Sequence, residues 1–174
     1  MKHYFKPYTN NRIFIETGTS SGVGVIAALN ANFKVIHSIE LAEYYYIQSQ
    51  KLFLNELDVH LYLGNSVTIL PKILNKIDEK CTFWLDAHWC GGNAGGTLEY
   101  IVLMDELKII ANHHIKEHTI LIDDMRLVRN KQAEWNSFPY TQKDIESFIY
   151  SININYRISY TFGEVEDDIL IAQI

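Results

Sequence analysis

Short apolar runs alternate with amphipathic stretches over residues 12–116, and this alternation restricts the fold more than any other feature of the sequence. The apolar runs predict strands, because each is too short for a helix and stops at a glycine or an acidic residue. We expect strands at residues 12–16, 34–39, 59–63, 82–85 and 119–122. Strands that are apolar throughout are typical of a parallel sheet with helices on both faces, linked by right-handed crossovers.

The amphipathic stretches predict helices at residues 22–32, 43–54, 66–76, 97–112 and 144–152. Ser66 is the expected cap of the third of these helices. Pro71 is expected to kink the same helix, because a proline cannot donate the backbone hydrogen bond of a helix interior.

The last two apolar runs, residues 156–162 and 169–173, are separated only by residues 163–168. This gap is too short for a crossover helix, so the two strands are expected to form an antiparallel hairpin. The sequence therefore predicts one α/β domain over residues 1–174. We expect three layers, with a mostly parallel, seven-stranded, Rossmann-like sheet that ends in the hairpin.

The charge of the chain limits its partners. The formal net charge is −6 and no basic stripe is evident, so nucleic acid is not expected as a partner. A scattered basic group could still bind an anionic substrate, although solvated surface charge is the simpler interpretation. This group consists of Lys108, Lys116, Arg126, Arg129 and Lys131.

Hydropathy and cysteine content indicate a cytoplasmic protein. No stretch approaches the roughly 18 apolar residues that span a bilayer, and residues 1–11 lack the apolar core of a signal peptide. The two cysteines, Cys81 and Cys90, provide neither a disulfide framework nor a four-ligand zinc site. We therefore expect reduced thiols and no membrane partner.

A glycine-rich loop, ETGTSSGVG at residues 16–24, follows the first predicted strand. Glycines at this point allow a sharp turn and a close approach of the backbone to a bound nucleotide. The loop alone does not identify the nucleotide, because residues 17–24 also match the TGxxxGxG pattern of short-chain dehydrogenases.

Two acidic residues and one missing motif separate the candidate cofactors. Glu16 would repel a dinucleotide pyrophosphate but can bind the ammonium group of S-adenosylmethionine. Glu40, at the end of the second strand, can accept hydrogen bonds from the ribose hydroxyls of either cofactor. The chain lacks the Tyr-x-x-x-Lys pair that a short-chain dehydrogenase needs, so S-adenosylmethionine is favoured.

With these residues the sequence resembles the class I S-adenosylmethionine-dependent methyltransferases over most of its length. The resemblance also includes the GNS turn at residues 64–66 and the LDAH segment at residues 85–88. It implies that the turn lies beside the adenine and that Asp86 lies near the transferred methyl group. Asn65 and Ser66 can equally form a simple turn and helix cap, and the two roles are compatible. The implied cofactor residues are Glu16, Thr17, Gly18, Thr19, Gly22, Gly24, Glu40, Asn65, Ser66 and Asp86.

Acidic residues also end the fourth and fifth strands, at Asp86 and at Asp123 and Asp124. These strands are neighbours in the expected order, about 5 Å apart, so their carboxylates repel one another unless they are protonated or bridged by a cation. Oxygen ligands of this kind suit Mg²⁺. The pattern is similar to that of the metal-dependent O-methyltransferases that act on catechols and macrolide sugars, and it implies a metal that holds two vicinal substrate oxygens. Loop capping is the alternative role of these aspartates.

His88 lies two residues after Asp86 and is a candidate general base, so these two residues are the expected catalytic pair. A loop histidine with a single backbone hydrogen bond is the alternative. Residues 89–96 (WCGGNAGG) predict a lid over the substrate. The DAHxxGG segment and the DDMR at residues 123–126 are similar to a group of bacterial methyltransferase-like proteins, which supports the family and names no substrate.

Other residues carry weaker expectations. His113, His114 and His118 are expected to be exposed rather than to bind a metal. Metal-dependent O-methyltransferases usually carry an N-terminal helical cover, and only residues 1–11 precede the first strand here, so the cover must come from the lid, from residues 129–140 or from another subunit. Tyrosines at residues 44–46 could form a homodimer contact, with packing inside the subunit as the alternative.

The sequence thus predicts a methyltransferase that modifies a hydroxyl group of a small molecule, with sugars or glycosides as the favoured class. Two alternatives stay open. One is another enzyme on the same fold that consumes S-adenosylmethionine or uses a nicotinamide. The other is a non-catalytic module that binds the cofactor and tolerates the loss of His88 and Asp86.

Overall fold

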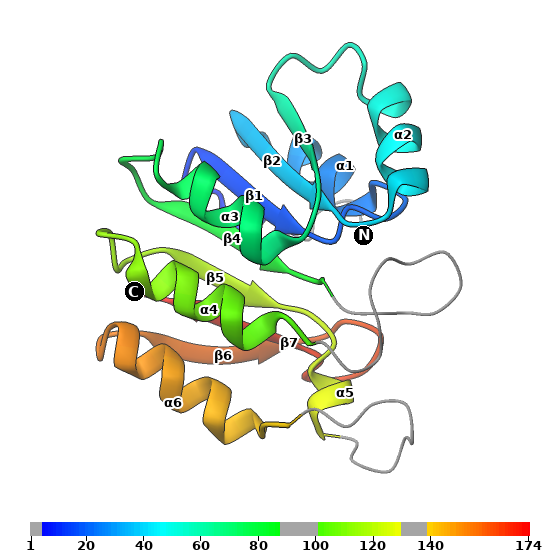
Figure 1. Ribbon diagram of the computed structural model, residues 1–174. Coiled ribbons are helices and arrows are strands. Elements are labelled where there is room, and N and C mark those ends of the chain that lie inside the picture. Colours follow the sequence, from blue (N-terminus) through cyan, green and yellow to red (C-terminus); the bar gives the residue numbers. More distant parts are fainter. Residues whose placement is uncertain (1–4, 88–100, 130–138) are drawn as a thin grey trace.

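The computed structural model describes residues 5–87, 101–129 and 139–174 (Figure 1). Its centre is a seven-stranded sheet in the order β3-β2-β1-β4-β5-β7-β6. The strands are β1 (Ile13–Thr17), β2 (Val35–Glu40), β3 (Val59–Leu63), β4 (Cys81–Leu85), β5 (Thr119–Ile122), β6 (Arg157–Thr161) and β7 (Ile169–Gln173). Each lies within one residue, at either end, of the range expected from the sequence.

The directions of the strands confirm the predicted topology. Strands β1 to β5 pair in parallel, whereas β7 runs antiparallel to both β5 and β6. Every residue of β1 and β4 is buried, as expected for central strands covered on both faces.

The helices alternate with the parallel strands. They are α1 (Val23–Asn30), α2 (Glu43–Leu52), α3 (Ser66–Leu74), α4 (Leu103–Asn112), α5 (Met125–Arg129) and α6 (Gln142–Ile152), and a short 3-10 turn, η1 (Lys6–Tyr8), precedes β1. The sequence predicted neither η1 nor α5, because each is too short to show an apolar periodicity.

Helices α1, α2, α3 and α6 lie within two residues, at either end, of the expected ranges, whereas the start of α4 and the cap of α3 differ from the expectation. Helix α4 begins at Leu103 rather than at residue 97, since residues 101–102 are not helical and residues 97–100 lie outside the described ranges. The cap of α3 is Asn65 rather than Ser66, because the Asn65 side chain accepts the backbone N–H of Val67 at 2.9 Å. Pro71 lies inside α3.

The two faces of the sheet carry separate apolar cores. One core lies beneath α3, α4 and α6 and is centred on Ile15, Phe83 and Leu107. The other lies beneath α1, where Phe5 packs against Phe14 and Trp84 with ring centroids 4.8 and 5.1 Å apart. The result is the predicted three-layer α/β/α arrangement (Figure 1). Among the helices in the described ranges, none is long and apolar enough to cross a membrane.

The expectation that all three histidines near β5 are exposed was wrong for two of them. His113 and His118 are buried at the amino edge of the sheet, and only His114 is exposed, beside Asp78. The two buried rings form a chain of hydrogen bonds that links the end of α4 to β4 and β5. Buried rings of this kind can be accommodated because each ring nitrogen has a partner.

The hydrogen bonds fix the protonation of both rings. The backbone N–H of Cys81 donates to His118 Nδ1 at 3.0 Å, so the His118 proton is on Nε2. That proton is donated to His113 Nδ1 at 2.9 Å, and His113 Nε2 donates in turn to the Ile77 carbonyl at 3.1 Å. His118 is therefore neutral in the folded protein. Burial, together with the nearby positive charge of Lys116, lowers the pKa of His118 to about 4, and a hydrogen bond with the Ile115 backbone opposes the fall.

The neutral His118 makes folding stability depend on pH. Its pKa is about 4 in the folded protein and about 6.5 in the unfolded chain, so the unfolded state binds the extra proton between these values. Its contribution is fully present above pH 6.5 and falls by about 3 kcal/mol as the pH drops to about 4. Urea denaturation of the wild type and of His118→Asn across this range measures the effect. Equal slopes in the two proteins would contradict the assignment.

Candidate cofactor site and acidic cavity

The candidate site lies at the edge of the sheet where the five parallel strands end. Backbone hydrogen bonds continue the pairing beyond the strands, from Gly18 N to the Ile39 carbonyl at 2.9 Å and from Asp86 N to the Thr17 carbonyl at 3.1 Å. This pairing brings the glycine loop, Glu40 and the LDAH segment together. Ligands of open parallel sheets bind in the crevice outside this edge.

The loop conformation requires glycine at residue 18. Gly18 has a φ of +88°, and a Cβ atom there would lie 2.5 Å from the Asp86 carbonyl oxygen. Gly22 has a φ of +79° and precedes the first turn of α1. Gly18 needs both a left-handed backbone and close contact with the end of β4, and only glycine meets both requirements.

Glu16 is buried beneath α1, on the face of the sheet opposite α3 and α4. Ser38 Oγ donates to Glu16 Oε2 at 2.5 Å, and Thr19 Oγ1 lies 2.6 Å from Ser38 Oγ. Burial raises the pKa of Glu16 to about 8, the Asp86 and Glu40 carboxylates raise it further, and the Ser38 hydrogen bond opposes the rise. The side chain fits there because Gly24 has no Cβ to meet its carboxyl group. Glu16 thus supports the loop, and its contact with a cofactor ammonium stays a prediction.

Glu40 lies at the end of β2 with both oxygens held by backbone N–H groups. Ser20 N donates to Glu40 Oε2 and Ala42 N donates to Oε1, each at 2.7 Å. A carboxylate has about four acceptor positions, so each oxygen can accept a further hydrogen bond. The side chain is therefore fixed at the edge of the sheet in a geometry that can bind two vicinal hydroxyl groups.

Glu106 is a residue of the site that the sequence analysis missed. It projects from α4 towards Thr17 and Ser66 and is only 1% exposed. Burial raises the pKa of Glu106 to about 7, the Asp86 and Asp105 carboxylates add to the rise, and the neighbouring Ser66 and Thr17 hydroxyls oppose it. Among the residues that the structure describes, Glu106 Oε1 makes no hydrogen bond of ordinary length and angle, although the Thr17 hydroxyl lies close enough to lower the pKa of Glu106. Unsatisfied buried oxygens of this kind call for a ligand or water.

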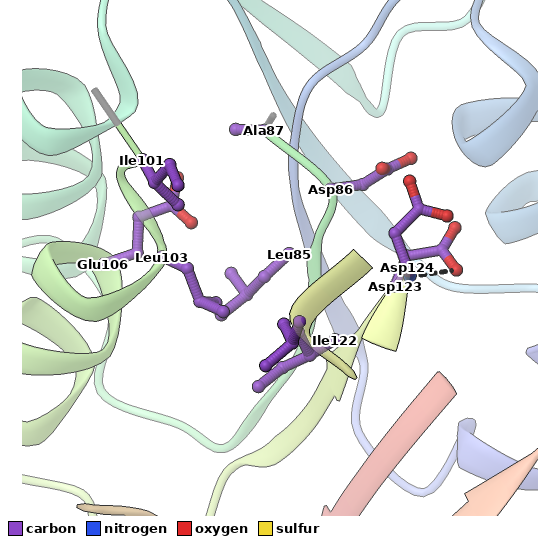
Figure 2. A pocket seen from close by; sticks show the side chains of 10 residues that line it. Leu85, Asp86, Ala87, Ile101, Leu103, Glu106, Ile122, Asp123 and Asp124 are labelled. Atoms are coloured by element: carbon purple, nitrogen blue, oxygen red, sulfur yellow. Dashed lines mark hydrogen bonds between the residues drawn. The ribbon is translucent and has the colours of Figure 1, made fainter. Parts of the chain in front are cut away.

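A cavity of about 20 Å³ separates Glu106 from the aspartates at the strand ends. Figure 2 shows Glu106 on one side of it and Asp86, Asp123 and Asp124 on the other. The remaining walls are apolar and include Leu85. The volume accommodates about one water molecule or a group of similar size.

Asp123 lines this cavity, and its pKa is higher than that of an ordinary aspartate. Burial, together with the neighbouring Asp86 and Asp124 carboxylates, raises the pKa of Asp123 to about 7. The backbone N–H of Asp124, which donates to Asp123 Oδ1 at 2.8 Å, opposes the rise. A carboxyl group with a pKa near neutrality can accept a proton from a substrate hydroxyl more readily than an ordinary aspartate.

The tightest group of carboxylates differs from the predicted metal set. Asp123, Asp124 and Asp168 each offer an oxygen, and these oxygens lie within 4.8 Å of one another. Asp168, which directly precedes β7, takes the third place that the sequence assigned to Asp86. No sequence signal marked it, because an aspartate in a hairpin turn looks like an ordinary turn residue.

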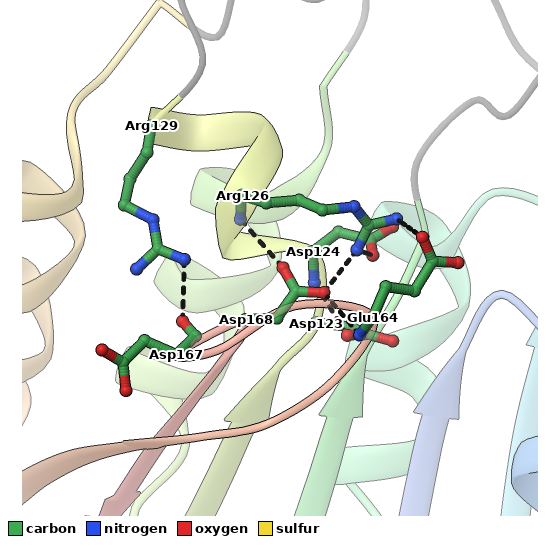
Figure 3. A network of polar contacts seen from close by, with 7 residues as sticks. All are labelled: Asp123, Asp124, Arg126, Arg129, Glu164, Asp167 and Asp168. Atoms are coloured by element: carbon green, nitrogen blue, oxygen red, sulfur yellow. Dashed lines mark hydrogen bonds and ion pairs between the residues drawn. The ribbon is translucent and has the colours of Figure 1, made fainter.

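Arg126 supplies a positive charge at this group (Figure 3). Its guanidinium donates to Asp124 and to Asp168 Oδ2, the latter at 2.5 Å, and pairs with Glu164 at 3.0 Å. Asp168 is fully buried and also accepts the backbone N–H groups of Arg126 and Glu164, each at 3.0 Å. The prediction that Arg126 is a surface residue or a free anion site does not match this pairing.

These contacts make the group a poor site for Mg²⁺. A metal bound by Asp124 and Asp168 would have to displace the guanidinium and the donors that already satisfy Asp168. The ligand set Asp86, Asp123 and Asp124 therefore stays a prediction from the sequence.

Two further predictions cannot be placed. His88, the candidate general base, and the lid at residues 89–96 lie outside the described residues. The other predicted cofactor residues are brought to one edge, with Asn65 as the cap of α3 and Ser66 buried beside Glu106.

No protein-family model and no curated protein matches the chain. Solved structures do match its fold. The methyltransferase PaMTH1 from Podospora anserina, bound to S-adenosylhomocysteine (SAH), has a TM-score of 0.63 at 13% identity, over 98% of this chain and 74% of that one. The O-methyltransferase from Bacillus cereus in complex with SAH has a TM-score of 0.58 at 17% identity, over 94% of this chain and 74% of that one. The chain therefore has the Rossmann-like methyltransferase fold, with a seven-stranded mixed sheet and an antiparallel C-terminal hairpin.

Proposed function

We propose that the protein is an S-adenosylmethionine-dependent methyltransferase that acts on a hydroxyl group of a small molecule, with sugars and glycosides as the favoured class. The observation that carries this proposal is the meeting of the glycine loop with Glu40 at the carboxyl edge of a methyltransferase fold. Gly18 lets the loop pack directly against the Asp86 backbone, and the fixed carboxylate of Glu40 fits two ribose hydroxyls. The residues present therefore fit a nucleoside cofactor.

When bound, the cofactor would supply a methyl group on a positively charged sulfur for in-line transfer to the acceptor oxygen, with SAH as the leaving group and release of the hydroxyl proton. The protein must align the two reactants and receive that proton. In our proposal Glu40 and the 16–24 loop hold the nucleoside, and Asp86 lies at the junction with the acceptor.

A carboxyl group can receive the proton without a metal. Asp123 lines the cavity beside Asp86 and has a pKa raised to about 7, so it is suited to this role together with the predicted base His88. Arg126 already neutralises Asp124 and Asp168, so this proton transfer needs no Mg²⁺.

Calorimetric titration with SAH tests the cofactor. We expect micromolar binding by the wild type and a loss of at least about a hundredfold in Glu40→Ala, because two charge-assisted hydrogen bonds to the ribose are worth about 3 kcal/mol. Glu43→Ala removes an exposed carboxylate three residues away and should bind as the wild type does.

The same titration with and without Mg²⁺ tests the metal. Affinity that is independent of Mg²⁺ agrees with the proposal, whereas a strong dependence would restore the predicted metal set. If the wild type binds no SAH in either condition, the methyltransferase function is wrong. Tight binding of a nicotinamide nucleotide instead would favour a reductase.

A further inference from the structure

The cavity between Glu106 and the strand-end aspartates has acidic residues on both sides. Glu106 is the acidic residue from α4, and Asp86, Asp123 and Asp124 directly follow β4 and β5 on the other side (Figure 2). Within the described part of the chain, no basic side chain lines the cavity. A ligand that enters it therefore meets a field that attracts a cation and repels an anion.

One oxygen in this cavity has unused acceptor capacity. Glu106 is 1% exposed, and its Oε1 has no hydrogen-bond donor among the described residues. The Ser66 and Thr17 hydroxyls lie beside the same carboxyl group. The Oε1 atom can therefore accept a further hydrogen bond from a ligand in the cavity.

Arg126 can neither donate a hydrogen bond to Glu106 nor bind an anionic ligand in the cavity. Arg126 is engaged by Asp124, Asp168 and Glu164 and does not line the cavity. An anionic ligand group would therefore find no free cation there. The guanidinium already balances the charge of the carboxylates that it contacts, so these do not require a second cation. The carboxyl group that still lacks a cationic partner is on the Glu106 side of the cavity.

We propose that the cavity binds the ammonium group of an organic acceptor, so that the acceptor is a hydroxylated amine. The inference rests on the proposed function and specifies its substrate class. An ammonium group donates three hydrogen bonds, is close to water in size and fits a cavity of about 20 Å³. The apolar walls, such as Leu85, Leu103 and Ile122, suit the carbon skeleton that carries it.

An ammonium group explains the cavity better than a metal ion does. Glu106 does not belong to the group of carboxylates that approach within 4.8 Å, so it cannot share a single ion with Asp124 and Asp168. An aminated acceptor needs only one donor group at Glu106 and leaves its hydroxyl free to face the methyl group.

Three catechols that differ only in charge test the inference. Dopamine carries an ammonium group, 4-methylcatechol is neutral and 3,4-dihydroxybenzoate carries a carboxylate. Saturation-transfer-difference NMR and calorimetry on the SAH-saturated protein, with EDTA present, give their affinities. We expect dopamine to bind at least about tenfold more tightly than 4-methylcatechol, and 3,4-dihydroxybenzoate to bind most weakly.

Two variants assign this preference to the cavity. Glu106→Gln keeps the shape and removes the charge, so it should weaken dopamine binding by about tenfold and leave 4-methylcatechol unchanged. Glu117→Gln, at an exposed ion pair with Lys80, is the matched control and should bind all three as the wild type does. If Glu106→Gln does not fold, Asp123→Asn on the opposite wall should reduce the same preference.

Several results would overturn the inference. These are equal binding of dopamine and 4-methylcatechol, preference for 3,4-dihydroxybenzoate, no dopamine binding at millimolar concentration, and binding of all three only when Mg²⁺ replaces EDTA. The SAH titration is read separately. SAH binding without charge preference refutes only the inference, whereas charge preference in a protein that binds no SAH refutes only the methyltransferase function.

Discussion

Gly18→Ala is expected to abolish SAH binding and to lower the free energy of unfolding by about 2–4 kcal/mol. An alanine at a φ of +88° adopts a strained left-handed backbone, which costs about 1–2 kcal/mol. Its Cβ would also lie 2.5 Å from the Asp86 carbonyl oxygen, a contact with backbone that no side-chain rotation can relieve. The loop would have to move away from β4, and the hydrogen bond from Asp86 N to the Thr17 carbonyl would weaken.

Urea denaturation and SAH calorimetry measure the two effects of Gly18→Ala. The control is Ser21→Ala, which removes a side chain from an exposed position of the same loop and should change neither quantity appreciably. Wild-type SAH affinity in Gly18→Ala would show that the cofactor does not depend on this approach of the loop to β4. A variant with wild-type stability that binds no SAH would instead show that Gly18 is required for the cofactor site and not for the stability of the fold.

Arg126→Leu is expected to destabilise the protein by about 3–5 kcal/mol, because it leaves the fully buried Asp168 carboxylate without its charged partner. The two backbone N–H groups that donate to Asp168 cannot replace a full positive charge. The guanidinium also pairs with Asp124 and Glu164, so the link between β5 and the β6–β7 turn would be lost as well.

Urea denaturation of three variants checks the role of Arg126. Arg129→Leu, which loses one hydrogen bond from an exposed side chain to the Asp167 carbonyl, is the control and should cost about 1 kcal/mol or less. The double variant Arg126→Leu/Asp168→Asn should recover part of the loss, since the buried charge is removed together with its partner. A loss below 1 kcal/mol in Arg126→Leu would mean that the ion pairs are not maintained in solution.

Arg126→Leu also tests the relation between the guanidinium and a metal. With the guanidinium absent, Asp123, Asp124 and Asp168 form an uncompensated group that can bind a divalent ion. Mn²⁺ should therefore stabilise the variant more than it stabilises the wild type. An equal response of both proteins would show that Arg126 does not occupy the place of a metal.

Most of the fold followed from local patterns in the sequence. The run at residues 169–173 and the short gap before it predicted the antiparallel hairpin, because six residues cannot form a crossover. The start of α4 was placed too early, since its apolar spacing extends before Leu103 and its cap, Val102, carries no side-chain signal. Asn65 and Ser66 were both plausible caps, and only the hydrogen bond to Val67 distinguished them.

The candidate site was predictable where its residues follow strand ends. Glu40, Asp86 and Asp123 each end a strand, and parallel strands bring their carboxyl ends to one edge. Glu106 lies inside a helix, where an acidic residue normally indicates a solvated face. Its burial depends on how α4 packs against α3 and β1, which the sequence of α4 does not contain.

The sequence by itself determined the order and type of the elements, the hairpin and the set of polar groups at the carboxyl edge, because these depend on periodicity, turn chemistry and loop length. The tertiary structure alone decided which charges are neighbours. It buried His113 with His118, placed Arg126 between Asp124 and Asp168, and turned Glu106 towards an acidic cavity. Contacts between residues 40 or more positions apart, such as Arg126 with Asp168, arise only when the strands align, since no local pattern encodes their separation.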